Sequence, residues 1–454
     1  MLSPDLSSGP LRQQARLYEV ALRLAERIVP ELQAMRTSKS GPLRTPERRQ
    51  LVRHRAQAFL AEKDELTQRV QGPEEANVLL EMVEAEVLGY GPLEPLLADD
   101  SISEIMVVGP AMVFVERAGK VGEIQVRFQD EAHLMRIIRN ILQPLGRTVT
   151  RAWPMADGRL PDGSRVNVVV PPSAVNGPSL TIRKFSRTPL LMEDLIGLGT
   201  LSPPMAALLY GCVLARLNVV VSGGTGSGKT TLLNALSDFI PEHERIVTIE
   251  DAAELQLNQR HVVTLESKPA EIDGSGRVTI RDLVMNALRM RPDRILVGEC
   301  RGGEALDMLQ AMNTGHDGSL TTAHSNGPRD CLTRLETMAL MSGMDLPLLV
   351  VRRQIANAVQ VVVHQARMRD GSRKVTHITE VQGIDDQTII MQDLFRFKQA
   401  GIDQATGKVQ GVFEPGGFKP RFNHKLEQVG VRLPDAFFVP EERRQGLGWG
   451  VSQH

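Results

Sequence analysis

Residues 219–231, Val-Val-Val-Ser-Gly-Gly-Thr-Gly-Ser-Gly-Lys-Thr-Thr, decide the fold of this 454-residue chain. Three β-branched residues open the stretch, which is typical of a buried strand. The segment from Gly223 to Thr230 has the spacing GxxxxGK[ST], and a helix-spaced apolar run begins at Leu232. Because strand, glycine-rich loop and helix follow in this order, the pattern predicts a loop that holds phosphate groups. A glycine-rich turn without a ligand is the simpler alternative.

Each residue type in this loop has a chemical task. Glycines lack a Cβ, so backbone amides can converge on phosphate oxygens. The helix that starts near Lys229 directs its positive end at the same anion. We expect Lys229 to reach the outer phosphates and the Thr230 hydroxyl to bind Mg²⁺. The predicted nucleotide-binding residues are Gly223, Gly224, Thr225, Gly226, Ser227, Gly228, Lys229, Thr230 and Thr231.

A second apolar strand, residues 294–298, ends at Glu299. Hydrolysis of a bound triphosphate needs a group that positions or deprotonates water. A strand of this kind beside the phosphate-loop strand would place Glu299 across from the γ-phosphate, so we interpret Glu299 as the carboxylate that activates water. Gly298 stands where an aspartate is usual at the end of such a strand. The alternative is a salt-bridged glutamate without a catalytic role.

A third strand, residues 246–249, is also followed by acidic residues. Glu250 and Asp251 come directly after it, and Glu254 follows one turn later. We expect Glu250 and Asp251 to hold Mg²⁺ partly through water. Because acidic residues often follow a strand at a protein surface, a purely structural role is the alternative for each of them.

Two histidines, His316 and His324, flank a short predicted strand. Their separation of eight residues across a strand does not fit a metal site. We expect either histidine to hydrogen-bond the γ-phosphate, or a strand neighbour, and so to respond to the nucleotide state. A satisfied structural histidine is the alternative for both.

Composition limits the other classes of function. The net charge is −1 and the calculated pI is about 6.8, so the chain as a whole is not attracted to nucleic acid. The three cysteines form no CxxC pair, which argues against disulfides and a zinc site. We expect no signal peptide and no membrane span, and therefore a cytoplasmic protein. The basic stretch 36–55 is interpreted as a solvated helix face, or alternatively as a contact for anionic lipid or an acidic partner.

Three further segments, taken with the phosphate loop, point to a known family. Residues 248–254 resemble the Asp box of secretion ATPases, residues 291–304 their atypical Walker B strand, and residues 313–325 their His box. All four boxes occur in the family order. The chain resembles type II/type IV secretion-system ATPases, and most closely the CpaF/TadA-type motors of tight-adherence (Flp) pilus assembly. The resemblance extends over roughly residues 80–440.

The resemblance implies a fold of class α/β: a RecA-like P-loop ATPase domain, a mixed α/β N-terminal domain and an N-terminal helical segment. It implies ATP and Mg²⁺ as ligands and a homohexamer that binds ATP between two lobes of each subunit. The partners implied are platform proteins of the inner membrane, to which the motor is bound peripherally from the cytoplasm, and no stable nucleic acid. The family motor moves pilin subunits during pilus assembly or secretion.

The resemblance also assigns arginines to the phosphates. The family's phosphate-contacting arginines lie in the N-terminal domain, and we favour Arg165 and Arg183 over Arg159 for this role. Arginine suits it because its charge is permanent and its donors are forked. Arg301, two residues after Glu299, matches the family as a further catalytic residue. Cys300 departs from the common valine and is expected to line the site.

The expected segments follow from composition and periodicity. Alternating strand and helix patterns predict a parallel sheet around the phosphate loop. Glycine and proline residues predict a linker before the ATPase domain. Phenylalanines predict that the segment after this domain packs on a surface. The segments are a flexible N-terminal extension (1–46), a helical bundle (47–88), a mixed α/β domain (89–186), a linker (187–204), the ATPase domain (205–391) and a C-terminal tail packed on it (392–454).

Two other functions remain open at this point. A DNA-translocating or helicase-type hexameric ATPase would share the phosphate loop, although no basic stripe with aromatic residues is evident. A nucleotide-gated scaffold without hydrolysis would also share it, although Lys229, Thr230 and Glu299 are all in place.

Overall fold

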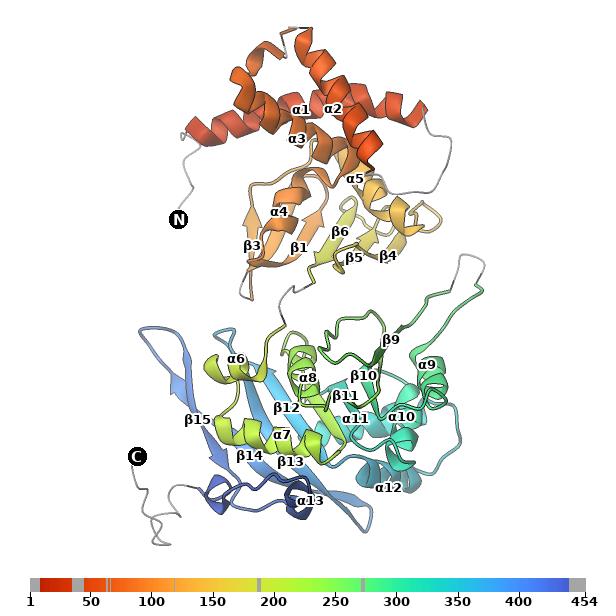
Figure 1. Cartoon of the computed structure of the whole chain (residues 1–454), viewed down its shortest axis with the longest axis vertical. Helices are drawn as coiled ribbons and strands as arrows, with labels where there is room; N and C mark the ends of the chain where they lie inside the picture. Colours follow the sequence, from red (N-terminus) through yellow and green to blue (C-terminus); the bar gives the residue numbers. More distant parts are fainter. Residues whose placement is uncertain are drawn as a thin grey trace. The chain divides into compact units, whose positions relative to one another are not determined.

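A computed structural model describes residues 9–34, 45–62, 64–65, 67–117, 119–185, 189–270 and 274–440. The chain divides into two compact units, Met1–Ser186 and Arg187–His454 (Figure 1). Among the described residues, no helix is both long enough and apolar enough to cross a membrane.

The first unit begins with a bundle of three helices, α1 (Gly9–Ala34), α2 (Pro46–Ala61) and α3 (Gly72–Leu88). They pack because each carries apolar residues at helical spacing on one face. Their fully buried side chains are Val20, Ala21, Leu24, Ala25, Ile28, Val52, Ala56, Leu79 and Val83.

Helix α1 corrects the expectation of a flexible extension over residues 1–46. Residues 9–34 are helical because Val20, Leu24 and Ile28 recur at intervals of four and are buried against α3. Residues 1–8 and 35–44 of the expected extension lie outside the described residues.

Three arginines of the basic stretch 36–55 are ion-paired at the surface of the bundle. Arg49 and Arg53 contact Glu84 at 2.8 and 3.1 Å, and Arg55 contacts Glu31 at 3.0 Å. Such pairs fit the interpretation as a solvated helix face. Arg36, Lys39 and Arg44 lie outside the described residues.

A six-stranded antiparallel sheet follows in the same unit, in the order β3-β2-β1-β6-β5-β4. Alternate residues of its strands, such as Ile105, Val166 and Ile182, pack against helix α5. Its elements are α4 (Glu94–Ala98), β1 (Ile102–Val108), β2 (Met112–Arg117), β3 (Lys120–Ile124), α5 (Glu131–Leu142), β4 (Met155–Arg159), β5 (Arg165–Val169) and β6 (Ser179–Arg183).

One buried carboxylate joins the bundle to this sheet. Glu86 of α3 is fully buried and accepts a hydrogen bond of 2.6 Å from the Tyr18 hydroxyl of α1. Its other oxygen lies 2.8 Å from His133 Nε2 and 3.0 Å from Arg136 Nη2, both on α5. Because a buried carboxylate is costly unless it is paired, these contacts couple the bundle to the sheet domain.

The second unit is built on a nine-stranded sheet in the order β15-β14-β13-β12-β7-β11-β10-β8-β9. The strands from β12 to β9 are parallel, and β13, β14 and β15 extend the sheet as antiparallel hairpins. The strands are β7 (Val219–Gly223), β8 (Ile246–Glu250), β9 (Val262–Glu266), β10 (Arg294–Cys300), β11 (Leu320–His324), β12 (Val361–Arg367), β13 (Arg373–Asp385), β14 (Thr388–Ile402) and β15 (Val409–Pro415).

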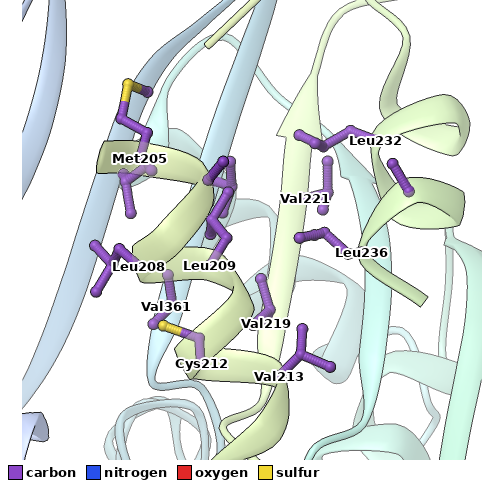
Figure 2. Packing of buried hydrophobic residues seen from close by; sticks show 14 of the residues in the cluster. Met205, Leu208, Leu209, Cys212, Val213, Val219, Val221, Leu232, Leu236 and Val361 are labelled. Carbon is purple, nitrogen blue, oxygen red and sulfur yellow. The ribbon is translucent and has the colours of Figure 1, made fainter. Parts of the chain in front are cut away.

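Helices cover both faces of the parallel part, so β7 is buried along its whole length. Figure 2 shows one face, on which α7 and α8 pack against Val219 and Val221 of β7. The helices on this face are α6 (Met192–Gly197), α7 (Pro203–Leu214), α8 (Lys229–Ser237) and α13 (Asn423–Gln428). Those on the other are α9 (Ile280–Ala287), α10 (Glu304–Asn313), α11 (Pro328–Leu340) and α12 (Leu348–Ala358).

Two of the expected segment boundaries are wrong. The expected linker 187–204 contains α6, and its residues Met192, Leu195 and Leu201 belong to the core of the unit. The boundary at residue 391 falls inside β14, so the residues up to Pro415 are strands of the sheet itself. These strands could not be predicted from the sequence, because apolar and polar residues alternate only weakly in long edge hairpins and glycines interrupt them.

Candidate functional site

The loop between β7 and α8 fits closely against strand β12, and this contact explains its glycines. A Cβ at Gly223 would overlap the Gln365 carbonyl oxygen and lie 2.6 Å from Ser227 Oγ. Gly228 has a φ of +93° and a Cβ there would lie 3.0 Å from Gln365 Nε2. Any side chain at these positions would move the backbone amides that are predicted to face a phosphate.

Lys229 is the first residue of α8 and only 7% exposed. Its amino group donates a hydrogen bond of 3.1 Å to the Gly224 carbonyl oxygen, across the loop. The same amino group lies 3.5 Å from each ring nitrogen of His324, at the end of β11. The lysine charge is therefore held between the loop and the neighbouring strand.

Glu299 lies at the same edge because β10, β11 and β7 are parallel and adjacent. His324 Nε2 is 2.9 Å from Glu299 Oε1, so lysine, histidine and glutamate form a continuous chain of contacts. Burial lowers the pKa of His324, and the Lys229 charge lowers that pKa further against the opposing effect of Glu299.

Arg301 holds the second oxygen of Glu299. Its Nη2 is 2.7 Å from Glu299 Oε2, and its Nη1 is 3.5 Å from Asp251 Oδ2. The hydrogen bond to Glu299 is the main cause of a raised pKa for Arg301. With His324 on one oxygen and Arg301 on the other, the Glu299 carboxylate is held in one orientation.

Glu250 has a different environment from the one expected of an open metal ligand. It is 4% exposed and accepts hydrogen bonds from the backbone amides of Glu254 (2.8 Å) and Leu255 (3.2 Å). Its side chain packs on Gly298, where a Cβ would lie 2.7 Å from Glu250 Cγ. This contact is the physical reason why glycine replaces the usual aspartate at position 298.

Replacing Gly298 with alanine is expected to destabilise the second unit by about 1–3 kcal/mol, because the added methyl group overpacks a closed contact. Displacement of Glu250 should also loosen the chain at Glu254. Urea unfolding, monitored by far-UV circular dichroism, measures the change in the free energy of unfolding. Gly197→Ala in α6 is the control, since a Cβ there meets nothing within 4 Å. Equal midpoints for the two variants would contradict the packing argument.

The structure separates the two predicted histidines. His324 joins the cluster at the carboxyl end of β11, whereas His316 precedes the amino end of the same strand, at the opposite edge of the sheet. His316 contacts its own loop, where its carbonyl oxygen accepts a hydrogen bond of 2.8 Å from Ser319. His316 is therefore not part of the Lys229–His324–Glu299 cluster, and its contact with the γ-phosphate or a strand neighbour stays a prediction.

Cys300 does not line the site either. It is 2% exposed and its Sγ lies 3.4 Å from Met308 Sδ and from Thr321 Oγ1, within the core. Burial raises the pKa of the Cys300 thiol to about 12. The expectation failed because alternate residues of β10 face opposite sides of the sheet, so that Glu299 and Cys300 diverge.

The predicted arginines belong to the first unit and form a row. Arg159, Arg165 and Arg183 are successive cross-strand neighbours on β4, β5 and β6, and Glu104 of β1 continues the row. They lie on the face of the sheet opposite to α5. Adjacent like charges are unfavourable in a sheet, so a row of three arginines is consistent with an anionic partner. Their contact with a nucleotide stays a prediction.

Sequence reasoning missed three residues beside the phosphate loop: Gln365, Arg367 and Arg373. Arg373 Nε donates to the Gly226 carbonyl oxygen at 3.4 Å, and Arg367 lies 3.6 Å from the position of a Cβ at Gly226. The only signal in the sequence was a cluster of basic residues around an Asp-Gly turn in residues 367–374. This cluster belongs to no motif, because only the pairing of β12 with β7 brings it to the loop.

The acidic residues do not form a metal site by themselves. Among the residues that the structure describes, no three histidine, cysteine, aspartate or glutamate side chains gather as metal ligands. Asp251 is exposed and accepts a hydrogen bond of 3.1 Å from Ser267 Oγ. A divalent cation at this edge would therefore depend on phosphate oxygens of a nucleotide, together with Thr230 and the carboxylates of Glu250 and Asp251.

The sequence of this chain is similar to those of several known proteins. Residues 86–411 match the family model described as "Type II/IV secretion system protein". A putative conjugal transfer protein of Mycobacterium tuberculosis is 38% identical over 347 residues, which are 72% of this chain and 98% of that protein. The type IV secretion system protein VirB11 of Brucella suis is 35% identical over 319 residues, which are 64% of this chain and 88% of that protein.

A solved structure of the VirB11 ATPase from the Brucella suis type IV secretion system covers 63% of this chain and 94% of its own, at 33% identity and a TM-score of 0.35. The family assignment rests on the sequence matches and not on this superposition. The second unit has the RecA-like P-loop fold that the motifs predicted. The chain therefore belongs to the family of type II/IV secretion system proteins.

Proposed function

We propose that this protein hydrolyses ATP and uses the reaction to drive a secretion or pilus-assembly machine. One observation carries the proposal: at the edge of the sheet where the phosphate loop opens, Lys229, His324, Glu299 and Arg301 are linked by contacts of 2.7–3.5 Å. A lysine for phosphate and an oriented carboxylate for water are the two groups that hydrolysis of a triphosphate requires.

The residues divide the chemistry between them. The loop amides and Lys229 hold the β- and γ-phosphates and offset the charge that develops on them. Glu299 accepts a proton from a water molecule as its oxygen attacks the γ-phosphorus, and the bond from that phosphorus to the bridging oxygen of ADP breaks. His324 and Arg301 keep the carboxylate in place. Mg²⁺ bound with the nucleotide would neutralise phosphate charge, with Thr230, Glu250 and Asp251 as its ligands, partly through water.

The proposal extends to the oligomeric state and the partners of the protein. We propose a homohexamer at the cytoplasmic face of the inner membrane that acts on platform proteins, in the manner of motors for Flp pilus assembly. Membership of the type II/IV secretion family supports this proposal. Arg165 and Arg183 are proposed to contact phosphate in the assembled ring, and their row on one face of the first unit supports an anionic partner.

DNA translocation is a second candidate, because a relative of 38% identity is named as a putative conjugal transfer protein. The two candidates differ in what stimulates hydrolysis. A motor for protein subunits responds to its membrane platform, whereas a motor that moves along DNA responds to DNA itself.

The test measures phosphate release by the purified full-length protein with ATP and Mg²⁺, with and without single-stranded DNA, beside its molar mass by light scattering. We expect hydrolysis that stops when EDTA removes Mg²⁺, a hexameric mass and no response to DNA. A well-folded hexamer that does not hydrolyse ATP would contradict the proposed motor function and would favour a nucleotide-gated scaffold. A several-fold increase with DNA would replace the secretion motor by the DNA motor.

A further inference from the structure

The hairpin formed by β12 and β13 closes on the phosphate loop from the side opposite to Glu299. Strand β12 lies next to β7 on one side, and β11 followed by β10 lies on the other. Gln365 is paired in register with Gly223 of the loop, and two residues later Arg367 is paired with Arg373 across the hairpin. The hairpin therefore brings two guanidinium groups to one flank of the loop.

Arg373 contacts the loop directly, and Arg367 lies beside it. Arg373 Nε donates to the Gly226 carbonyl oxygen at 3.4 Å, and its Cγ lies 3.7 Å from the position of a Cβ at Gly228. Arg367 Nη1 lies 3.6 Å from the position of a Cβ at Gly226. Arg367 is exposed and Arg373 is half-buried, and Arg373 Nη1 also donates to the Gly371 carbonyl oxygen at 3.2 Å.

Two buried polar atoms on this flank have no hydrogen-bond partner among the described residues. They are Gln365 Oε1 and Ser227 Oγ, in side chains that are 2% and 1% exposed. A buried polar atom without a partner costs free energy, and a ligand that pairs with it recovers that cost. Because Gln365 Nε2 lies 3.0 Å from the Cβ position of Gly228, its side chain extends along the loop and not into the core.

The hairpin is held in place before any ligand arrives. Asp370 at its turn accepts a hydrogen bond of 2.8 Å from the Val409 amide of β15 and one of 2.7 Å from the Ser372 hydroxyl. At the base of β13, Lys374 donates a hydrogen bond of 2.5 Å to the Gly199 carbonyl oxygen. A group anchored in this way binds a ligand without a large loss of conformational entropy.

The position of Glu299 sets the direction of a nucleotide in the site. Its γ-phosphate belongs on the β11–β10 side, near Glu299 and His324, so the α-phosphate and the ribose extend toward β12. We propose that Arg367 and Arg373 bind the α-phosphate and ribose end of ATP and ADP, with Gln365 beside them. This role rests on the proposed function and deepens it, since the hairpin then sets affinity for the nucleotide and does not take part in hydrolysis.

The test compares nucleotide affinity and turnover in the full-length protein. The double variant R367A/R373A is expected to raise the dissociation constants of fluorescent ADP and of a non-hydrolysable ATP analogue equally, by about tenfold or more, because a charge-assisted hydrogen bond is lost at each position. KM for ATP should rise in proportion, while kcat falls by less than about threefold. R367A/R373K should bind both nucleotides more tightly than R367A/R373A, since lysine keeps the charge without the fork.

Arg369→Ala is the matched control, because Arg369 is an exposed arginine of the same turn and its removal changes the net charge by the same amount as either single variant. ADP affinity of the double variant within twofold of this control would overturn the proposal. A loss for the ATP analogue but not for ADP would also overturn it, because the arginines would then act at the γ-phosphate. In both cases the wild-type protein still hydrolyses ATP, whereas a wild-type protein that neither binds nor hydrolyses ATP would refute the proposed function itself.

Discussion

Replacing Glu299 with glutamine should leave ATP bound and slow its hydrolysis by at least about a hundredfold, the usual contribution of a positioned general base. The amide keeps the size of the side chain but cannot accept the proton of the attacking water. It can still accept a hydrogen bond from Arg301 or His324, so the fold of the site should survive. Single-turnover phosphate release and the dissociation constant of ATP separate chemistry from binding.

Glu242→Gln is a suitable control for this experiment, since Glu242 is exposed in the loop that precedes β8, and its replacement removes the same charge. We expect this control to hydrolyse ATP at the wild-type rate. If Glu299→Gln turned over ATP as fast as the control, Glu299 would not be the catalytic base, and the proton would have to pass to another group.

Replacing Lys229 with alanine is expected to weaken ATP binding by about a hundredfold or more. Truncating one partner of a buried, hydrogen-bonded charge pair costs about 2–5 kcal/mol, and 2.7 kcal/mol corresponds to a hundredfold change in affinity. Lys229 is 7% exposed, so its contact with phosphate is shielded from water. Equilibrium binding of a fluorescent ATP analogue measures the loss.

Lys425→Ala removes an exposed lysine from α13 and serves as the control for the change in net charge. The thermal midpoint of Lys229→Ala without nucleotide, compared with that of the wild-type protein, shows whether the variant is folded. Affinity equal to that of the control, in a folded protein, would remove the assignment of residues 223–231 as the phosphate loop.

The two variants also distinguish the roles of neighbouring residues. His324 contacts both Lys229 and Glu299. Removing either partner changes the charge beside the ring, so the two effects should not add in a double variant. Effects that do not add would show that Lys229, Glu299 and His324 act together, although they come from α8, β10 and β11.

Much of this site could be predicted because the signals are local. The order of strand, glycine loop and helix around Lys229 lies within 20 residues, and each apolar strand that ends in an acid indicates the same edge of a parallel sheet. Glu299 was predicted in this way and lies in the contact chain with Lys229. His324 follows by the same logic, because it ends β11.

The failures have a common cause in contacts between distant residues. His316 and His324 looked equivalent, yet His316 precedes β11 and His324 ends it, so they lie at opposite edges of the sheet. Helix α1 looked like a loose extension because its apolar face is completed only by α3, about 60 residues later. The hairpin arginines carry no motif and reach the loop only through the pairing of Gln365 with Gly223.

The glycine-rich loop between a strand and a helix, the strand that presents Glu299 and the α/β class of the unit all follow from local sequence, because backbone conformation and side-chain period are properties of neighbouring residues. Tertiary structure alone decided which side chains surround the loop: His324 and not His316, Glu250 packed on Gly298, and Arg367 with Arg373 on the flank. The reason is that the order of strands in the sheet places β12 beside β7 although more than 130 residues of chain lie between them, and no local rule carries that information.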